Sequence, residues 1–446
     1  MMRVSSQFLP IRPTLEKEIC HPKIWRRWRR AVGGGMVLGG LSFVLTATGA
    51  PWIQTTSFPI PAGNFGQPEG FAEHSMVYAS GFLYHAGGFG DFYGESARVL
   101  YSQVQSNGTI GTWNETTPML AMILDHASVA ANGFVYVLGG THYTPDSNGG
   151  YETLTNAVYY SQINSNGTLG IWQTATPLPQ PAYLFSASVW SNRIYCIGGW
   201  NGQALISNVY SATIQSDGSL SAWGTQRSLP LAISTHAGVA NGMIYVLGGA
   251  INGGTAIHNK VYYAVINADG TLGIWNETTP LPESLSALRA VAANGRVFVM
   301  GGWNGIAPTR SFYSAPVKGD GSLVSWSAGP ALIRELFYCG AAVSESHIFV
   351  SGGQSNTRIE SAVYSTALPV PPAAPAIVSQ SFTNGNFQLG FSAPTNTGFG
   401  LLASTNLTDW LRIGAGFTGT NGVLLLQDTN AASFPQRFYR TFWPLP

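Results

Sequence analysis

Charged side chains are scarce in this chain of 446 residues. Asp, Glu, Lys and Arg make up 9% of the sequence, against about a quarter in an average soluble domain. A surface helix needs a polar face, which is usually charged, so this scarcity argues against a helical fold. The composition of 45% hydrophobic residues, 12% aromatic residues and 54 glycines instead favours an all-β chain with a large core.

Basic residues are few outside the first part of the chain. Residues 1–50 hold eight of the 21 Lys and Arg residues, together with two acidic residues. Without this segment, 13 basic and 18 acidic residues remain, a net charge of −5. Because no basic stripe is left, we expect no nucleic-acid partner.

Cysteine and the common catalytic motifs are also rare or missing. The three cysteines are Cys20, Cys196 and Cys339, and the last two lie far apart in apolar runs, where a thiol packs as a small buried side chain. The sequence contains no Gly-x-Ser-x-Gly, His-Glu-x-x-His, Cys-x-x-Cys or phosphate-loop motif. We therefore expect no disulfide framework, and we assign no catalytic residue, metal or cofactor.

Residues 1–50 predict an export signal. An arginine-rich stretch with the phrase RRWRR precedes the uncharged run AVGGGMVLGGLSFVLTATGA, which ends in small residues. A basic region, an apolar run and small residues at the end are the three parts of a secretory signal. We expect cleavage after Gly49 and a periplasmic, cell-surface or extracellular location, reached by the general or the twin-arginine route. Six glycines make the run a poor membrane span, so membrane contact is expected only if the signal stays attached.

One phrase recurs five times in the rest of the chain. Asn-Gly or Asp-Gly stands between two apolar runs in SNGTIGTW, SNGTLGIW, SDGSLSAW, ADGTLGIW and GDGSLVSW, which begin at positions 106, 165, 216, 268 and 319. This dipeptide in this setting predicts a tight hairpin, for which a type I′ turn needs positive φ at both residues.

A second series alternates with the first. Six strand-like runs end in a double glycine, and the first glycines of the pairs are at positions 87, 139, 198, 248, 301 and 352. The spacing of 50 to 59 residues, with four strand-like runs in each unit, is typical of a propeller blade. We name the runs A to D: A is rich in small residues and innermost, B ends in Gly-Gly, C carries a Tyr as in VYYSQIN, and D carries a Trp that packs between blades. These are Trp113, Trp172, Trp223, Trp275 and Trp326.

The double glycine, the Tyr of run C and the Trp of run D together resemble a kelch repeat of the galactose-oxidase-like propeller class, over residues 51–366. The sixth unit lacks a run D, but WIQTTSFPIPA from Trp52 matches IWQTATPLPQPA around Trp172. The sequence therefore predicts a six-bladed propeller that is closed by its N-terminal strand.

A Pro-rich linker at 367–376 and a small β-sandwich at 377–446 are expected to follow. The phrases ASTNLTDW and RFYR in this last part are similar to a fibronectin-III-like module of exported bacterial proteins. The resemblance implies a spacer or a surface attachment.

Two histidines, His74 and His126, occupy the same position at the start of run A, and His236 lies within one residue of it. They could converge on a metal at the mouth of the central channel, or each could bond to a neighbouring blade. Phe185, Leu288 and Cys339 occupy this position in the other blades, which disfavours a metal. The adjacent Tyr338 and Cys339 echo the copper site of galactose oxidase, but we carry over no catalytic residue.

The loops between runs B and C vary in length and content, and they share one face with the D to A connections. Because rigid scaffolds carry function on variable loops, we place a ligand-binding site on this face. Exposed Trp beside Asn and Arg suits a sugar or a protein partner, although Trp200 and Trp303 could instead only cover the core edge. The candidate residues are Asp91, Phe92, Tyr93, His142, Tyr143, Trp200, Asn201, Trp303, Asn304, Arg310, Arg334, Glu335 and Arg358.

These features predict an exported, monomeric propeller that binds a glycan or a surface protein through this face, without catalysis. A carbohydrate-active enzyme similar to the sialic-acid mutarotase branch of kelch proteins is the first alternative, with Arg289, Arg334 and Glu335 assisting ring opening. A purely structural envelope protein is the second.

Overall fold

The computed structural model describes residues 50–59, 70–90, 94–144, 151–252, 256–369, 376–393, 398–405 and 411–442. The expected export signal at 1–49 lies outside these residues. The described residues form an all-β structure that also contains the short 3-10 helix η2 (Ala431–Ser433). None of their helices is long and apolar enough to cross a membrane.

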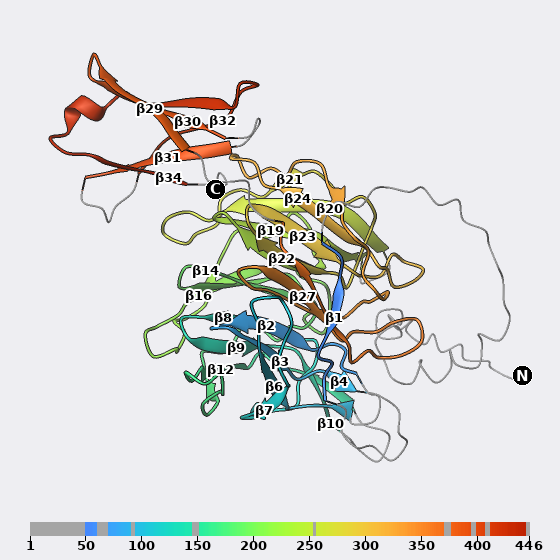
Figure 1. Ribbon diagram of the computed structural model, residues 1–446. Helices are drawn as coiled ribbons and strands as arrows, with labels where there is room; N and C mark the ends of the chain where they lie inside the picture. The colour runs from blue at the N-terminus through green and yellow to red at the C-terminus, as the bar shows by residue number, and fades with distance from the viewer. Residues whose placement is uncertain are drawn as a thin grey trace, which may run out of the picture.

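Six four-stranded antiparallel sheets, which we call blades one to six, form the first part of the fold (Figure 1). In strand order, blade one consists of β2 (Ser75–Ala79), β3 (Phe82–Ala86), β6 (Val99–Gln103) and β7 (Asn114–Thr116). Blade two consists of β8 (Ala127–Ala131), β9 (Phe134–Leu138), β12 (Val158–Gln162) and β13 (Gln173–Thr174). Blade three consists of β14 (Ser186–Trp190), β15 (Arg193–Ile197), β16 (Val209–Thr213) and β17 (Gly224–Thr225).

Blades four to six complete the set. Blade four consists of β18 (Ser234–Ala240), β19 (Met243–Ile251), β20 (Ala256–Val265) and β21 (Asn276–Thr278). Blade five consists of β22 (Arg289–Ala293), β23 (Arg296–Met300), β24 (Phe312–Pro316) and β25 (Ser327–Ala328). Blade six consists of β26 (Gly340–Val343), β27 (His347–Ser351), β28 (Val363–Ala367) and β1 (Ile53–Thr55).

The six blades form a closed ring. The first strand of each blade contacts the first strand of the next, in the order β2, β8, β14, β18, β22, β26 and back to β2. These inner strands carry small residues, such as the ASVAA sequence of β8, because they crowd together around the central channel. The fold class expected from the repeats, a propeller built from four-stranded sheets, is confirmed.

The N-terminal strand closes the ring, as expected. β1 pairs antiparallel with β28 through Ile53 and Ser365, Gln54 and Tyr364, and Thr55 and Val363. In Figure 1 the blue β1 accordingly lies beside the orange strands of blade six. Trp52 is buried, and its indole N–H donates to the carbonyl of Pro330 at 3.0 Å.

The core lies in the seams between blades, where the Trp of run D was expected. Each buried hydrophobic cluster of the ring combines residues of two neighbouring blades. The indole N–H groups of the other five Trp side chains donate to carbonyls of the preceding blade at 2.9 to 3.0 Å, namely those of Thr56, Thr117, Thr176, Arg227 and Thr279. A repeated tryptophan therefore both fills each seam and fixes its register.

The repeated C to D phrase forms a tight hairpin, but the predicted type I′ turn is wrong. In the first repeat only the glycine of the pair, Gly108, has a positive φ, of 81°. Asn107 Oδ1 accepts hydrogen bonds from the backbone N–H and the hydroxyl of Thr109, at 3.0 and 2.7 Å. This Asx interaction holds Asn107 outside the left-handed region, so the glycine alone makes the bend.

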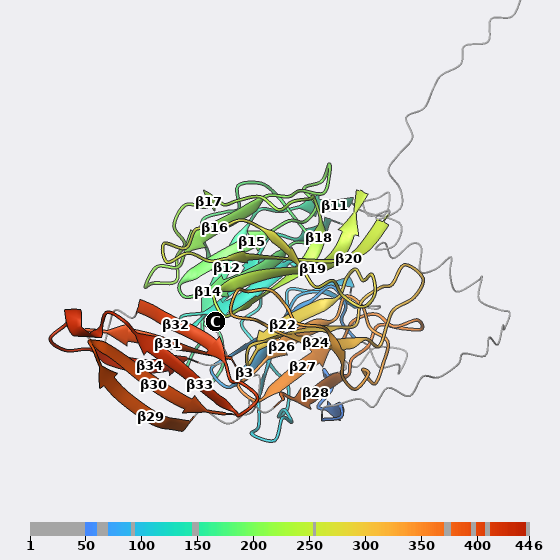
Figure 2. The same cartoon turned by 90° about the horizontal axis from the view of Figure 1, so that it is seen from above.

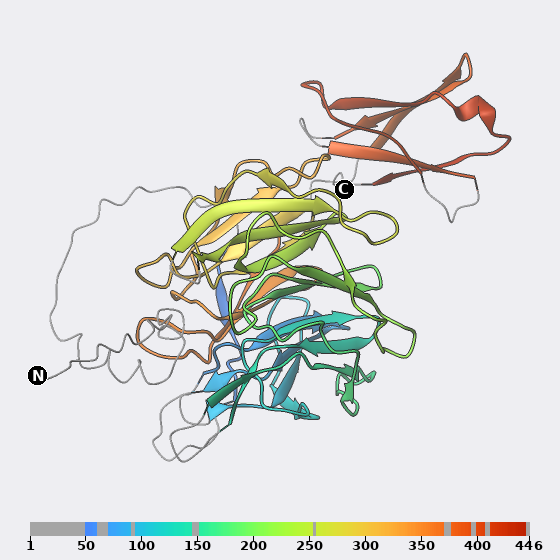
Figure 3. The same ribbon diagram turned by 180° about the vertical axis from the view of Figure 1, so that it is seen from behind.

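The C-terminal part forms two three-stranded sheets (Figures 2 and 3, red). They are β29 (Ala376–Thr383), β30 (Asn386–Ser392) and β33 (Val423–Asp428), and β32 (Leu411–Phe417), β31 (Gly398–Ser404) and β34 (Phe438–Phe442). The phrase RFYR supplies two bonds to the buried Asp428: an ion pair from Arg437 at 3.1 Å and a hydroxyl bond from Tyr439 at 2.9 Å. The resemblance to fibronectin type III stays a prediction.

Candidate ligand-binding face

The B to C loops and the D to A connections meet at one end of the propeller, which we call the loop end. In blade three Trp200, just after the double glycine, pairs with Tyr183, just before strand A. The same pairing joins Trp303 to Ser286 and Gln354 to Phe337. The C to D hairpins lie at the opposite end, which we call the hairpin end.

The B to C loops take two forms. Blades one, two and four carry longer hairpins, formed by β4 (Phe89–Gly90) with β5 (Gly94–Glu95), by β10 (Thr141–Thr144) with β11 (Tyr151–Leu154), and by the extensions of β19 and β20. Blades three and five carry a short turn after Trp200 or Trp303. Blade six has a comparable short turn after Gln354.

Five residues with positive φ line the channel mouth at the loop end, each next to the start of a strand A. They are joined around much of the ring by backbone hydrogen bonds of 3.0 to 3.3 Å. Non-glycine residues in this conformation are uncommon and cluster at functional sites. We call these five the mouth residues: Glu73, Asp125, Leu184, Ala287 and Tyr338. Sequence reasoning missed them, because their one shared signal in the sequence is their position just before the small-residue run A.

Arg289 brings positive charge to this mouth. Its guanidinium contacts Nε2 of His236 on the neighbouring blade, and both side chains are half-buried. Burial lowers the pKa of the Arg289 guanidinium, whereas nearby Cys339, Asp125 and Tyr338 act in the opposite direction. An arginine stays protonated in proteins, so Arg289 presents a cation beside the acidic Asp125.

The three histidines at the start of run A bond to neighbouring blades. His74 Nε2 lies 3.0 Å from the Ser351 hydroxyl, and His126 Nε2 lies 2.7 Å from the Ser75 hydroxyl. Together with the contact of His236 and Arg289, these bonds match the second interpretation of the three histidines. In the described part of the chain no group of three His, Cys, Asp or Glu residues is placed to hold a metal ion.

A further buried histidine, His85, was not singled out from the sequence. Its ring is fully buried and packs against the rings of Phe58, Phe71 and His74, with centroid distances of 4.5 to 4.6 Å. Burial lowers the pKa of His85 to about 3 and that of His126 to about 4. These imidazoles are therefore neutral at physiological pH.

Aromatic side chains lead from the blade-five loop to the mouth. Trp303 packs against Phe337 at 5.6 Å between ring centroids, and Phe337 packs against the mouth residue Tyr338 at 5.0 Å. Trp200 and Trp303 are both half-buried. Each tryptophan therefore covers the core edge and still presents part of its ring to solvent.

The two asparagines after these tryptophans shape their loops. Asn201 Oδ1 accepts the N–H groups of Gln203 and Ala204, both at 3.0 Å. Asn304 Oδ1 does the same for Ile306 and Ala307, at 3.0 and 2.9 Å. These turns leave Ile306 84% exposed at the loop tip, an apolar residue that sequence reasoning missed.

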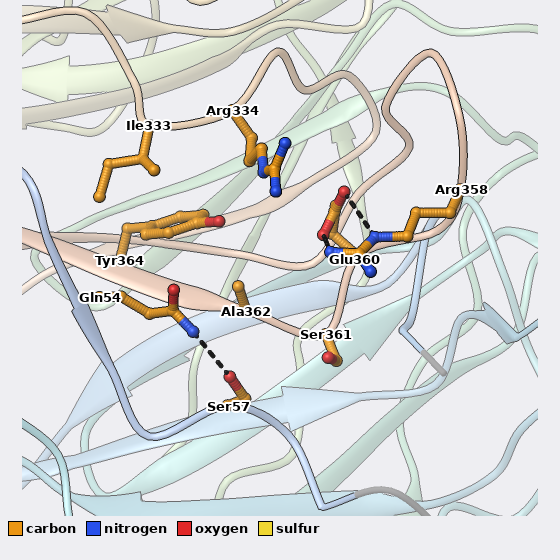
Figure 4. A pocket seen from close by; sticks show the side chains of 9 residues that line it. All are labelled: Gln54, Ser57, Ile333, Arg334, Arg358, Glu360, Ser361, Ala362 and Tyr364. Carbon is orange, nitrogen blue, oxygen red and sulfur yellow. Dashed lines mark hydrogen bonds and ion pairs between the residues drawn. The ribbon is translucent and has the colours of Figure 1, made fainter. Parts of the chain in front are cut away.

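Arg334 and Arg358 are brought together at the closure seam, in a pocket of about 210 Å³ (Figure 4). Buried Glu360 accepts two hydrogen bonds from Arg358, at 3.0 and 2.9 Å. The side chain of Arg334 lies near the hydroxyl of Tyr364 (Figure 4). We call this the seam pocket, lined by Gln54, Ser57, Ile333, Arg334, Arg358, Glu360, Ser361, Ala362 and Tyr364.

The remaining candidates are dispersed. Arg310 is exposed and donates from Nε to the carbonyl of Leu332, and Glu335 is half-buried outside the seam pocket. His142 and Tyr143 lie on β10, where His142 is half-buried. Asp91, Phe92 and Tyr93 lie outside the described residues.

Relatives of this chain carry kelch repeats. No family model matches the chain. Kelch repeat and BTB domain-containing protein 12 of Homo sapiens is 28% identical over 189 residues, which cover 38% of this chain and 28% of that protein. Kelch-like protein terF of Aspergillus terreus is 24% identical over 294 residues, which cover 63% of this chain and 60% of that protein. The chain thus spans less than two thirds of the length of these curated relatives.

A solved structure agrees with this likeness at the level of the fold. The structure of YjhT matches with a TM-score of 0.54 and 14% sequence identity, and it covers 71% of this chain and 97% of YjhT. At this identity the match carries information on the fold alone. The repeat period, the ring of four-stranded sheets and these relatives together identify the ring as a kelch-type β-propeller.

Proposed function

We propose that this protein is an exported propeller that binds a glycan or a surface protein at its loop end, without catalysis. The observation that carries the proposal is the arrangement at the channel mouth. There the Arg289 cation contacts His236 and interacts electrostatically with Asp125, and the aromatic rings of Trp303, Phe337 and Tyr338 pack in a row. Sugar sites combine aromatic planes with a few polar groups, and Trp, Tyr and Arg are enriched at protein hot spots.

Export and the role of the C-terminal module belong to the same proposal. The basic, then apolar, then small-residue pattern of residues 1–50 supports a cleaved signal. Mass spectrometry of the native protein should then find an N-terminus next to residue 50, whereas an intact Met1 in a cytoplasmic fraction would refute export. The C-terminal sheets would act as a spacer or an attachment to the cell surface.

The binding proposal is tested by screening the full chain on a glycan array and against purified surface proteins. Trp200→Ala and Trp303→Ala should weaken the detected binding. Trp190→Ala is the matched control, because this tryptophan is 40% exposed at the far end of β14, on the hairpin end. Equal binding by all three variants, with unchanged thermal unfolding, would place the site elsewhere.

A second candidate is a carbohydrate isomerase similar to sialic-acid mutarotases, as the sequence resemblance implies. The contact of Arg289 with His236 favours it, because a cation and an imidazole at one mouth can bind an acidic sugar and move its hydroxyl proton. NMR exchange between the anomers of sialic acid should then be accelerated by the protein, and less so by Arg289→Gln. Exchange at the spontaneous rate would exclude this activity.

A further inference from the structure

The seam pocket exists only where the two ends of the ring meet. Gln54 and Ser57 come from β1 and the residues after it, Ile333 and Arg334 from the connection into blade six, and the other lining residues from blade six itself. Gln54 also pairs with Tyr364 in the closing ladder. The pocket is therefore assembled by ring closure, and it is distinct from the channel mouth.

Charge in the seam pocket is positive toward solvent. Glu360 is buried, with 3% of its side chain exposed, and both oxygens of its carboxylate accept hydrogen bonds from the Arg358 guanidinium. The Arg358 side chain is 47% exposed, and Arg334 is exposed as well. Two arginines against one buried, paired carboxylate leave one net positive charge, which suits a monoanion.

The rest of the seam pocket suits a hydroxylated body attached to that anion. Ser57 and Ser361 offer hydroxyls, and Gln54 offers an amide that lies 3.4 Å from the Ser57 hydroxyl. Ile333 is 39% exposed at the rim and provides an apolar contact. The volume of about 210 Å³ far exceeds the roughly 10 to 15 Å³ that one water molecule needs.

We propose that the seam pocket binds one acidic sugar residue of the uronate type, and that its occupation stabilises closure of the ring. Arg334 and Arg358 bind the carboxylate as a pair. The hydroxyls of the sugar bond to Ser57, Ser361 and Gln54, and one face of the ring rests on Ile333. This site is separate from the channel mouth and does not depend on the function proposed there.

Stabilisation follows from the position of the pocket. A bound sugar contacts residues at the beginning and at the end of the propeller, so it binds the closed ring better than an opened one. A ligand that binds only the closed form shifts the equilibrium toward that form. Resistance to thermal unfolding therefore rises with the concentration of uronate.

The experiment uses the full chain with sodium glucuronate as the probe, by isothermal titration calorimetry and thermal unfolding. Glucose is the neutral counterpart of the same shape, and sodium sulfate is an anion without hydroxyls. We expect one glucuronate per chain, an increase of a few degrees in Tm at saturation, and binding to glucose and sulfate weaker by about tenfold or more.

Variants assign the binding to the pocket. Arg334→Gln should lower glucuronate affinity by about tenfold or more. Arg334→Lys should lower it less, because lysine keeps the positive charge but cannot donate two parallel hydrogen bonds to a carboxylate. Arg227→Gln is the matched control, because Arg227 is an exposed arginine of blade three outside the pocket. Ser57→Ala should weaken binding a few-fold and reduce the increase in Tm. Trp303→Ala should leave glucuronate binding intact, which keeps this result separable from the loop-end proposal.

Several results would overturn the proposal. They are no glucuronate binding to the native chain, equal binding by Arg334→Gln, or sulfate bound as tightly as glucuronate. Tighter, Arg334-dependent binding of a short glutamate-containing peptide would assign the pocket to an acidic protein segment instead. Binding without any increase in Tm would refute the link to ring closure.

Discussion

The polar groups at the two ends of the propeller find their hydrogen-bond partners in different ways. At the hairpin end the same local bonds recur five times: an Asn or Asp oxygen accepts the N–H and the hydroxyl of the Thr or Ser two residues later, at 2.9 to 3.1 Å and 2.7 Å. At the loop end the polar groups bond across blades, as His74 does to Ser351 and His126 to Ser75. The hairpin end also bonds across blades, because the Tyr84 and Tyr136 hydroxyls donate to the hairpin glycine carbonyls of the next blade, Gly167 and Gly218, at 2.9 and 2.8 Å. These bonds repeat from blade to blade, whereas the bonds between blades at the loop end come from side chains that differ between blades.

Ring closure supports both ends, so its loss should have the largest effect. Deleting residues 51–59 removes β1, leaves β28 as an open edge and strips Trp52 from its seam against Phe312. We expect Tm to fall by several degrees or more, with aggregation, and Trp52→Ala alone to cost roughly 3 kcal/mol. Thermal unfolding of this deletion is compared with that of a chain lacking residues 376–446. A greater loss from the larger deletion would contradict the importance of the closing strand.

Lowering the pH should have the next largest effect on the free energy of unfolding, and groups at the two ends should respond in different pH ranges. Burial lowers the pKa of His126 to about 4 and of His85 to about 3, so in the folded chain both stay neutral below the ordinary value of 6.5. The unfolded chain takes up these protons first. The stability these groups contribute is therefore complete above pH 6.5, and it is lost as the pH falls toward 4 and 3, by up to about 1.4 kcal/mol per pH unit for each imidazole.

The hairpin-end carboxylates respond in a lower window. Hydrogen bonds from Ser219 and Thr271 lower the pKa of Asp217 and Asp269 below the ordinary 3.8. Their contribution is present above pH 3.8 and disappears only below it. Urea unfolding at pH 7, 5.5 and 4.5 should therefore show a loss that His126→Asn reduces, since Asn can keep the bond to Ser75. A variant as pH-dependent as the native chain would show that other groups dominate.

A smaller effect should follow from removing one hairpin bond. Asn166→Ala deletes the acceptor for the N–H and the hydroxyl of Thr168, at 3.1 and 2.7 Å, and should cost about 1 kcal/mol. Gln105→Ala, at an exposed hairpin position, is the control and should be close to neutral. Ligand binding at the loop end should not change in either variant. Loss of binding would mean that the two ends are coupled.

The contrast between the ends also explains what could be predicted from the sequence. The seam tryptophans and the closing strand recur with the repeat, so their positions follow from periodicity alone. The turn type was wrong because the side chain of Asn107, rather than the preference of Asn-Gly pairs, decides the backbone there. The seam pocket could not be foreseen, because Gln54 and Arg358 lie 304 positions apart and meet only through closure. The mouth residues share no residue type, so only backbone geometry reveals them.

The smallest change in stability is expected from substituting two exposed isoleucines, one at each end of the propeller. Ile306 is 84% exposed at the tip of the blade-five loop, and Ile171 is 81% exposed just after the hairpin of blade two. Changing either to Ser should alter the free energy of unfolding by less than about 0.5 kcal/mol, because neither side chain is packed. An exposed apolar side chain in the same loop as Trp303 can lose its water against a ligand, so Ile306→Ser should weaken whatever the glycan or protein screen detects. Ile171→Ser should leave that binding unchanged, and equal weakening by both variants would contradict a binding surface confined to the loop end.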